Sequence, residues 1–449
     1  MTQSVLFTNA RLFTGTCDEV GEAAAIWVEG ALIRFAGRAS DLPALPDHLR
    51  RVDLNGRFVM PGMTESHTHM SFTGVSPEAL DKLPVEQTMV GAINNARVML
   101  GAGFTSAISF GSMYRIDPHL RAAIERGDIP GPRLLASGHD MGATGSNADL
   151  QADHLKRPDG LGRMADGPWE IRKAVRSMRK NGAQVVKLFL DGEGLCDYAP
   201  PGELTYTDEE VEAAISEAKN RNMRVATHSR SAAAVKQAVK FGADFIGHAN
   251  FLDDEAVDML GRARDRVSVG PAIAWEVQFL RHHESMGISR QTVRDWGYER
   301  EVEATVDAVR RLRKAGVRVL VGGDYGLHIT PHGSYACDLE YFVDLFGMSS
   351  TEALLCATRD GGAAADPSGM LGTLEEGKYA DLVIVDGDPV ADIRILQDLE
   401  RIVAVMKGGK LYRGLARREP HLVSPDDLAA PAALAQAERM LTLADEDAR

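Results

Sequence analysis

The chain has 449 residues, and 64 acidic against 50 basic side chains give it a net charge of −14. This acidic balance, without a cluster of Lys and Arg, argues against nucleic acid or an anionic membrane as the main partner and favours a small-molecule substrate. Hydrophobic residues make up 44% of the chain, which excludes disorder of the whole chain. At about 150 residues per domain, length alone predicts roughly three domains, unless one barrel takes up most of the chain.

The sequence predicts a cytoplasmic protein with reduced cysteines. The N-terminal residues lack the charged and apolar regions of a secretory signal, and no apolar run approaches the ~20 residues of a membrane span. The four cysteines lie far apart without CxxC spacing: Cys17, Cys196, Cys337 and Cys356. This pattern favours thiols in or near the core over disulfides or a cysteine zinc site.

Both ends of the chain have the pattern of β-strands joined by short turns. The turns are Glu29-Gly30-Ala31 near one end and Lys407-Gly408-Gly409 near the other. The strands predicted around them are 26–28, 32–35, 381–385, 403–406 and 410–412. We therefore expect one small β-domain, a β-sandwich built from residues 1–61 and 367–415.

The middle of the chain alternates short β-branched runs with long amphipathic segments, the pattern of βα units around a parallel sheet. The predicted strands are one ending near Ser66 and then 105–110, 133–137, 185–190, 224–227, 245–247, 266–269 and 318–321. The predicted helices include 208–220, 232–241 and 301–315. These eight strand positions predict an α/β fold with a (β/α)8 TIM barrel over residues 62–366. Residues 416–449 would form a helical C-terminal extension or a frayed tail.

Polar side chains follow these strands at their carboxyl ends, where the catalytic mouth of such a barrel lies. His67 and His69 are two residues apart, so on an extended strand their rings share one face and can bind one metal ion. Lys187, His228, His248 and Asp324 follow later strands. His67 and Asp324 are 257 residues apart, about 37 per step over seven βα steps, and a unit needs about 30 or more. Each residue alone could be a hydrogen-bonded interior group, but their joint pattern favours one shared site.

Two motifs resemble the amidohydrolase superfamily, and specifically its binuclear members with a carboxylated lysine. One is Pro61-Gly62-Met63-Thr64-Glu65-Ser66-His67-Thr68-His69, in which Glu65-Ser66 replaces the more usual Asp-x, and the other is the closing segment 372–383. The resemblance covers about residues 4–413.

This resemblance implies two divalent metal ions, zinc first, with cobalt, manganese or iron as alternatives. A CO2-derived carbamate on Lys187 would bridge them. His67, His69 and Asp324 would complete the shell of one ion, and His228 and His248 that of the other. Asp324 would also be catalytic, passing a proton to the leaving nitrogen. The alternative for Lys187 is an uncarboxylated side chain that pairs with Asp324 beside a single ion.

Further side chains near the predicted mouth are candidate substrate contacts. His139 follows the third strand and is a second catalytic candidate that could polarise the substrate carbonyl, or it could order a loop. Arg230 could bind a substrate carboxylate or form a surface salt bridge. The remaining candidates are Tyr325, Trp275 and His332, with packing as the alternative role.

Residues 330–362 resemble the branch that contains prolidase-like and carboxypeptidase-like amidohydrolases together with phenylurea and thiocarbamate hydrolases. This implies a metal-dependent hydrolase of an amide-like C–N bond in an aryl amide, a urea or a carbamate. A dipeptide or an N-acyl amino acid is the alternative substrate, and a non-catalytic barrel scaffold is a remote alternative. Family analogy also favours a homo-oligomer.

Overall fold

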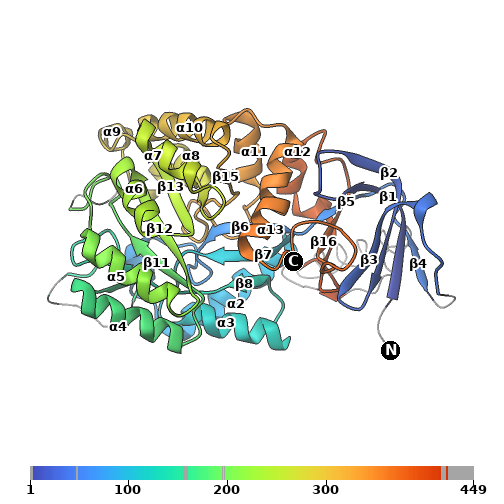
Figure 1. Cartoon of the computed structure of the whole chain (residues 1–449), viewed down its shortest axis with the longest axis horizontal. Coiled ribbons are helices and arrows are strands. Elements are labelled where there is room, and N and C mark those ends of the chain that lie inside the picture. Colours follow the sequence, from blue (N-terminus) through green and yellow to red (C-terminus); the bar gives the residue numbers. More distant parts are fainter. Residues whose placement is uncertain are drawn as a thin grey trace, which may run out of the picture.

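A β-domain lies beside a barrel of parallel strands wrapped in helices (Figure 1). The structure is a computed structural model that describes residues 4–46, 49–152, 154, 160–194, 196, 198–415 and 421–422. Both ends of the described chain enter the β-domain, and the middle forms the barrel. The predicted α/β class, the TIM barrel and the terminal β-domain are therefore confirmed. The predicted C-terminal extension, 416–449, lies almost wholly outside the described residues.

The β-domain is one nine-stranded sheet. Its strands are β1 (Ser4–Phe13), β2 (Val20–Glu29), β3 (Leu32–Arg38), β4 (Arg50–Asp53), β5 (Phe58–Pro61), β16 (Leu382–Val385), β17 (Ile402–Lys407), β18 (Lys410–Arg413) and β19 (His421–Leu422). The two chain ends meet where β16 runs antiparallel to β5, with Val383 opposite Met60. Alternating apolar residues of both halves, including Phe7, Ile26 and Ile384, form a common core.

The barrel contains strands at all eight predicted positions. These are β6 (Met63–Thr68), β7 (Phe104–Ser109), β8 (Arg133–Leu135) continuing as β9 (Ser137–Gly142), β11 (Val185–Phe189), β12 (Arg224–Ser231), β13 (Phe245–Phe251), β14 (Ser268–Gly270) and β15 (Arg318–Val319). A short strand, β10 (Gly162–Met164), pairs with β9. The barrel closes between its last and first strands, because the amide of Ser66 donates to the carbonyl of Val321 at 3.0 Å. This closure brings Asp324 beside His67, 257 residues earlier in the sequence.

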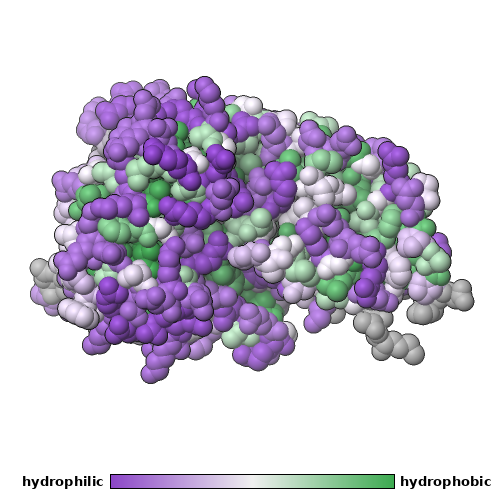
Figure 2. Space-filling view, viewed as in Figure 1, coloured by the Kyte–Doolittle hydropathy of each residue, from purple (hydrophilic) through white to green (hydrophobic). Residues whose placement is uncertain are grey.

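Amphipathic helices cover the outside of the barrel, and hydrophilic side chains cover most of the visible helix layer (Figure 2). They are α2 (Val85–Gly101), α3 (Ile116–Arg126), α4 (Gly167–Lys180), α5 (Asp208–Lys219), α6 (Ala232–Phe241), α7 (Asp254–Arg262), α10 (Tyr298–Lys314), α12 (Ser350–Leu355) and α13 (Gly361–Ala365). Shorter or inserted helices are α1 (Pro77–Leu80), α8 (Ile273–His282), α9 (Arg290–Asp295) and α11 (Cys337–Asp344). Among the described helices, none is both long and apolar enough to cross a membrane.

Two sequence expectations differ from the structure in detail. Strands β12 and β13 extend past His228 and His248, because their pairing continues from His228 opposite Gly247 to Ser229 opposite His248. The four cysteines are free thiols, but only Cys196, Cys337 and Cys356 are buried, whereas Cys17 is exposed. Cys17 lies in the loop between β1 and β2, outside the core.

Candidate metal centre

His67, His69 and Asp324 form a cluster with the geometry of a metal site. The two histidines lie at the end of β6, and Asp324 follows β15 on the neighbouring side of the closed barrel. Asp324 Oδ1 is 3.5 Å from His67 Nε2 and 3.1 Å from His69 Nε2. One ligand atom from each of the three residues lies within 4.8 Å of the others. A single cation can contact all three, since zinc binds nitrogen and oxygen ligands at about 2.0–2.2 Å.

The other three predicted ligands surround the same point. The His248 ring lies 5.2 Å from the His67 ring and 4.3 Å from the His228 ring, measured between centroids. Lys187 is 1% exposed. Its Nζ lies 4.8 Å from the Phe110 ring, on which His67 stacks. The structure thus brings all six predicted ligands together at the barrel mouth.

The donor set fits a divalent metal ion. Both ring nitrogens of His67 and of His248 are buried and have no hydrogen-bond partner among the described residues. A buried polar atom without a partner is costly and rare, and a metal ion satisfies a ring nitrogen directly. His69 Nδ1 lies 3.2 Å from the Gly111 carbonyl. This contact fixes a proton on Nδ1 and leaves Nε2 free to bind a metal, the usual arrangement of a ligating histidine.

Burial and charge set the protonation states of the predicted ligands. Burial lowers the pKa of His69, but Asp324 and Asp140 outweigh burial and raise that pKa, whereas the other groups reach the states that metal binding requires. Burial lowers the pKa of His67 and of His248 well below the usual value, so both rings are neutral. Burial also lowers the pKa of Lys187 to about 8, against the opposing field of Asp140 and Asp324. Burial alone would raise the pKa of Asp324, but His67, His69 and Lys187 outweigh it and hold that pKa far below its usual value. Asp324 is therefore ionised at neutral pH.

The backbone around the site is strained and tightly packed. His248 and Asp324 have positive φ angles of 75° and 60°, which are unfavourable for residues other than glycine. Such strain costs about 1–3 kcal/mol per residue and clusters at functional sites. A Cβ on Gly322 would lie 2.6 Å from the His67 amide nitrogen, so only glycine lets the last strand approach the first this closely.

The candidate substrate contacts, unlike the predicted metal ligands, do not all lie in one cluster. His139 lies on β9 and is 3% exposed, and its neighbour in the sequence, Asp140, is the residue whose side chain lies near His69. Trp275, on α8, is 2% exposed, and its indole N–H donates to Glu193 at 3.1 Å. Tyr325 lies in the main hydrophobic core and donates to the Tyr335 carbonyl. His332 is held between the Tyr335 hydroxyl and the His69 carbonyl. The positions of Tyr325 and His332 therefore favour packing.

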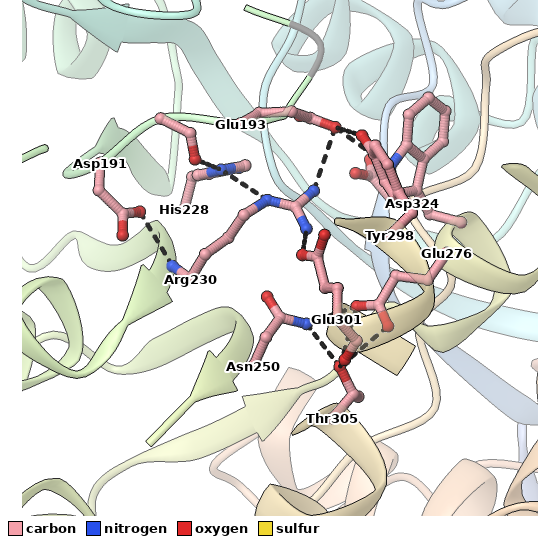
Figure 3. A network of polar contacts seen from close by, with 12 residues as sticks. Asp191, Glu193, His228, Arg230, Asn250, Glu276, Tyr298, Glu301, Thr305 and Asp324 are labelled. Carbon is pink, nitrogen blue, oxygen red and sulfur yellow. Dashed lines mark hydrogen bonds and ion pairs between the residues drawn. The ribbon is translucent and has the colours of Figure 1, made fainter. Parts of the chain in front are cut away.

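Arg230 is not on the surface, so the predicted alternative of a surface salt bridge is wrong. Its side chain is 0% exposed and is enclosed by polar partners (Figure 3). Nη1 pairs with Glu301 on α10, and Nη2 lies 3.2 Å from Glu193 in the loop after β11. Nε lies 3.3 Å from His228 Nε2. The guanidinium thus connects a predicted ligand to two acids, and a charged group buried this deeply needs such partners.

Sequence reasoning missed Asp140 and Glu193. Glu193 Oε1 accepts hydrogen bonds from Trp275 and Tyr298, each at 3.1 Å, and forms an ion pair with Arg230, so it organises the wall next to His228. Asp140 lies 3.9 Å from His69 Nδ1. Asp140 is adjacent to His139 in the sequence, but side chains alternate along a regular strand, so a pattern that points His139 inward points Asp140 away.

Comparisons with known proteins agree with this site. The model of the Amidohydrolase family matches residues 58–412. Ochratoxinase from Aspergillus niger is 25% identical over 418 residues, which cover 87% of this chain and 83% of that protein. An imidazolonepropionase from Rhizobium meliloti (strain 1021) is 24% identical over 416 residues, covering 86% and 92%.

Among solved structures, a Xaa-Pro dipeptidase with bound methionine superposes with a TM-score of 0.81 and 29% identity, covering 92% of this chain and 100% of that one. Amidohydrolases generally use divalent metal ions, which agrees with the cluster of His67, His69 and Asp324. The chain belongs to the Amidohydrolase family and is an enzyme that hydrolyses carbon–nitrogen bonds.

Proposed function

We propose that the chain is a binuclear metal-dependent hydrolase of an amide-like C–N bond in an aryl amide, a urea or a carbamate. The observation that carries the proposal is the convergence of four histidines, Asp324 and Lys187 at one barrel mouth. Both ring nitrogens of His67 and of His248 lack a hydrogen-bond partner among the described residues. In the proposal, His67, His69 and Asp324 hold one ion and His228 and His248 the other, with a carbamate on Lys187 between them. Histidine, carboxylate and carbamate donors suit zinc, with cobalt, manganese and iron as alternatives.

The metal ions, when bound, would activate a water molecule and polarise the scissile carbonyl. Asp324 is ionised at neutral pH, so its carboxylate can accept the proton of the attacking water and deliver it to the leaving nitrogen. His139, within β9, would donate to the substrate carbonyl oxygen, and Trp275 would form an apolar wall.

Lys187 would become the carbamate by attack of its neutral amine on CO2, with loss of one proton. Its pKa of about 8 gives a substantial neutral fraction near physiological pH, whereas an exposed lysine, with a pKa near 10.4, would be almost fully charged. Burial among Phe110 and Phe189 is the physical cause of this low pKa. A carbamate would also remove the cost of a buried ammonium next to two cations.

Because Arg230 is already paired with protein side chains, we infer a substrate that is uncharged near the bond that reacts. Lys187 and Arg230 are cations whose charges act on the predicted ligand histidines His67, His228 and His248. Lys187 would be a carbamate ligand and would no longer carry a positive charge. Arg230 contacts Glu193, Glu301 and His228. A substrate carboxylate would have to break a buried ion pair to reach Arg230.

A dipeptidase or N-acyl amino acid hydrolase is the second candidate. The likeness to the Xaa-Pro dipeptidase, at 29% identity over nearly the whole chain, favours it. A hydrolysis screen on metal-loaded enzyme distinguishes the two, with phenylureas, thiocarbamates and aryl amides in one arm and dipeptides and N-acyl amino acids in the other. We expect the higher kcat/KM in the first arm. A preference of tenfold or more for dipeptides would replace the first proposal with the second.

Metal analysis of the purified chain tests the shared part of both proposals. We expect about two divalent ions per chain and loss of activity on chelation. A chain without bound metal that zinc, cobalt and manganese all fail to activate would leave a non-catalytic scaffold. The proposal also includes a homo-oligomer in the cytoplasm. The family analogy supports the oligomer, and the free thiols support a reducing compartment.

A further inference from the structure

We propose that Asp140 is an additional acidic residue of the metal centre, a positioning residue that orients His69 and neutralises the site. This inference rests on the proposed metal-dependent function. Asp140 is 2% exposed, and its Oδ2 lies 3.9 Å from His69 Nδ1. Neither carboxylate oxygen has a hydrogen-bond partner among the described residues. A buried carboxylate without a partner is expensive, so its presence beside the ligands needs a compensating positive charge.

A bulge in β9 brings Asp140 into the site. In the pairing of β9 with β11, Val185 lies opposite Ser137, and Lys187 lies opposite Asp140. Between these two pairs, β9 therefore contains one residue more than β11. In a regular ladder, His139 would be the residue opposite Lys187. The extra residue re-aims the chain so that Asp140 shares a face with Lys187. Bulges of this kind occur next to active sites and serve to redirect a side chain.

Gly111 provides the space for this carboxylate. A Cβ at position 111 would lie 1.9 Å from Asp140 Oδ1, so no other residue type fits against the carboxylate as it stands. Gly111 also has a φ of 143°, and its carbonyl contacts His69 Nδ1 at 3.2 Å. The Gly111 carbonyl and the Asp140 carboxylate therefore both face the same ring nitrogen. The Gly111 carbonyl accepts the His69 proton on Nδ1, and the negative charge of Asp140, 3.9 Å away, favours that tautomer, so Nε2 faces Asp324.

The charge of the centre also favours an additional acid. Two divalent ions bring +4, whereas a carbamate on Lys187, ionised Asp324 and one hydroxide bring −3. Asp140 supplies the remaining negative charge and makes the centre neutral. Because the site is buried and of low dielectric, one uncompensated charge there is costly, and an outer carboxylate of this kind typically contributes about 10–100-fold in metal affinity.

The test is Asp140→Asn, which keeps the size of the side chain and removes its charge. Asp117→Asn is the matched control, because Asp117 on α3 is also fully buried with neither carboxylate oxygen hydrogen-bonded among the described residues. The charge of His69 acts on Asp117 as well, but within the described part of the chain no ion pair joins Asp117 to a predicted ligand. Metal affinity is measured by zinc titration against a competing chelator at pH 8, and the stability of the metal-free protein by urea unfolding. Neither readout depends on turnover.

We expect Asp140→Asn to weaken zinc binding by about 10–100-fold and to leave the urea midpoint of the metal-free protein unchanged or raised. Asp117→Asn should keep zinc affinity within about threefold of the wild type. Equal zinc affinity in Asp140→Asn and wild type would overturn the inference while leaving the proposed function intact. A lowered midpoint of metal-free Asp140→Asn with normal zinc affinity would also overturn it, because Asp140 would then be merely structural. A wild type that binds no zinc would overturn both proposals.

Discussion

Arg230→Met tests whether Arg230 supports the site from within or contacts the substrate. The side chain is 0% exposed and pairs with Glu301, whose side chain is 3% exposed, and with Glu193. Methionine keeps most of the volume but leaves Glu301 without its cation. Breaking a buried pair on one side costs about 3–5 kcal/mol. With a urea dependence of about 3 kcal/mol/M, the unfolding midpoint of the metal-free protein should fall by roughly 1–1.7 M.

Arg176→Met is the matched control for this measurement. Arg176 makes a two-pronged pair with Glu217, at 2.9 and 3.0 Å, but its side chain is 51% exposed. Without Arg176, Glu217 is still paired with Arg221 at 2.6 Å, so no carboxylate is left without a cation and the midpoint should shift by no more than about 0.3 M. Adding Glu301→Gln to Arg230→Met should restore part of the lost stability, because it removes the unpaired carboxylate.

The destabilisation of Arg230→Met should also depend on pH. Burial already raises the pKa of Glu301, and loss of the Arg230 charge raises it further. The folded state then holds a proton more tightly than the unfolded state, so stability falls as pH rises through the folded-state pKa. The penalty should therefore be smaller at pH 6 than at pH 8.

Two results would refute this reasoning. One is an Arg230→Met midpoint equal to that of Arg176→Met. The other is a loss of more than tenfold in kcat/KM for carboxylate-bearing substrates relative to neutral ones. This result would show that Arg230 contacts the substrate. We expect the ratio of the two kcat/KM values to change by less than about threefold.

The remaining predictions concern the metal ligands and the residues that hold them. Asp324→Asn should still bind metal but lose about 10²–10⁴-fold in kcat, and near-normal turnover would remove Asp324 as the proton carrier. At a fixed CO2 concentration, zinc should reconstitute the metal-free protein faster at pH 8.5 than at pH 6.5. With a pKa of about 8, the neutral fraction of Lys187 rises from about 3% to about 75%, and a rate independent of pH would count against a carbamate. Gly111→Ala should weaken zinc binding at least as much as Asp140→Asn, because the added Cβ would clash with the Asp140 carboxylate. Normal zinc affinity in Gly111→Ala would show that the carboxylate can move away without loss of zinc binding.

The parts of the fold that follow from local periodicity could be predicted from the sequence. Examples are the strand predicted to end near Ser66, which ends at Thr68, and the helix predicted over 208–220, which spans Asp208–Lys219. An i, i+2 histidine pair and a capping box each act over a few residues. The spacing of Lys187, His228 and His248 also indicated the barrel mouth, because each βα unit returns the chain to the same end. Only the strand ends were less accurate, since pairing between β12 and β13 continues beyond the apolar run that defines a strand in the sequence.

Residues whose roles depend on partners distant in the sequence could not be assigned in this way. Arg230 lies two residues after His228, and its burial depends on Glu301 on α10, 71 residues later. Asp140 depends on one extra residue in β9, and a bulge has no distinct signature in the residues Ser137–Gly142. In both cases the side chain is ionisable and buried, so its function depends on which charges surround it. For Arg230, two acids already neutralise the guanidinium, so the residue supports the site from behind. For Asp140, no described residue donates a hydrogen bond to the carboxylate, so its charge remains available to the metal centre. This difference in charge compensation separates a supporting residue from a member of the site.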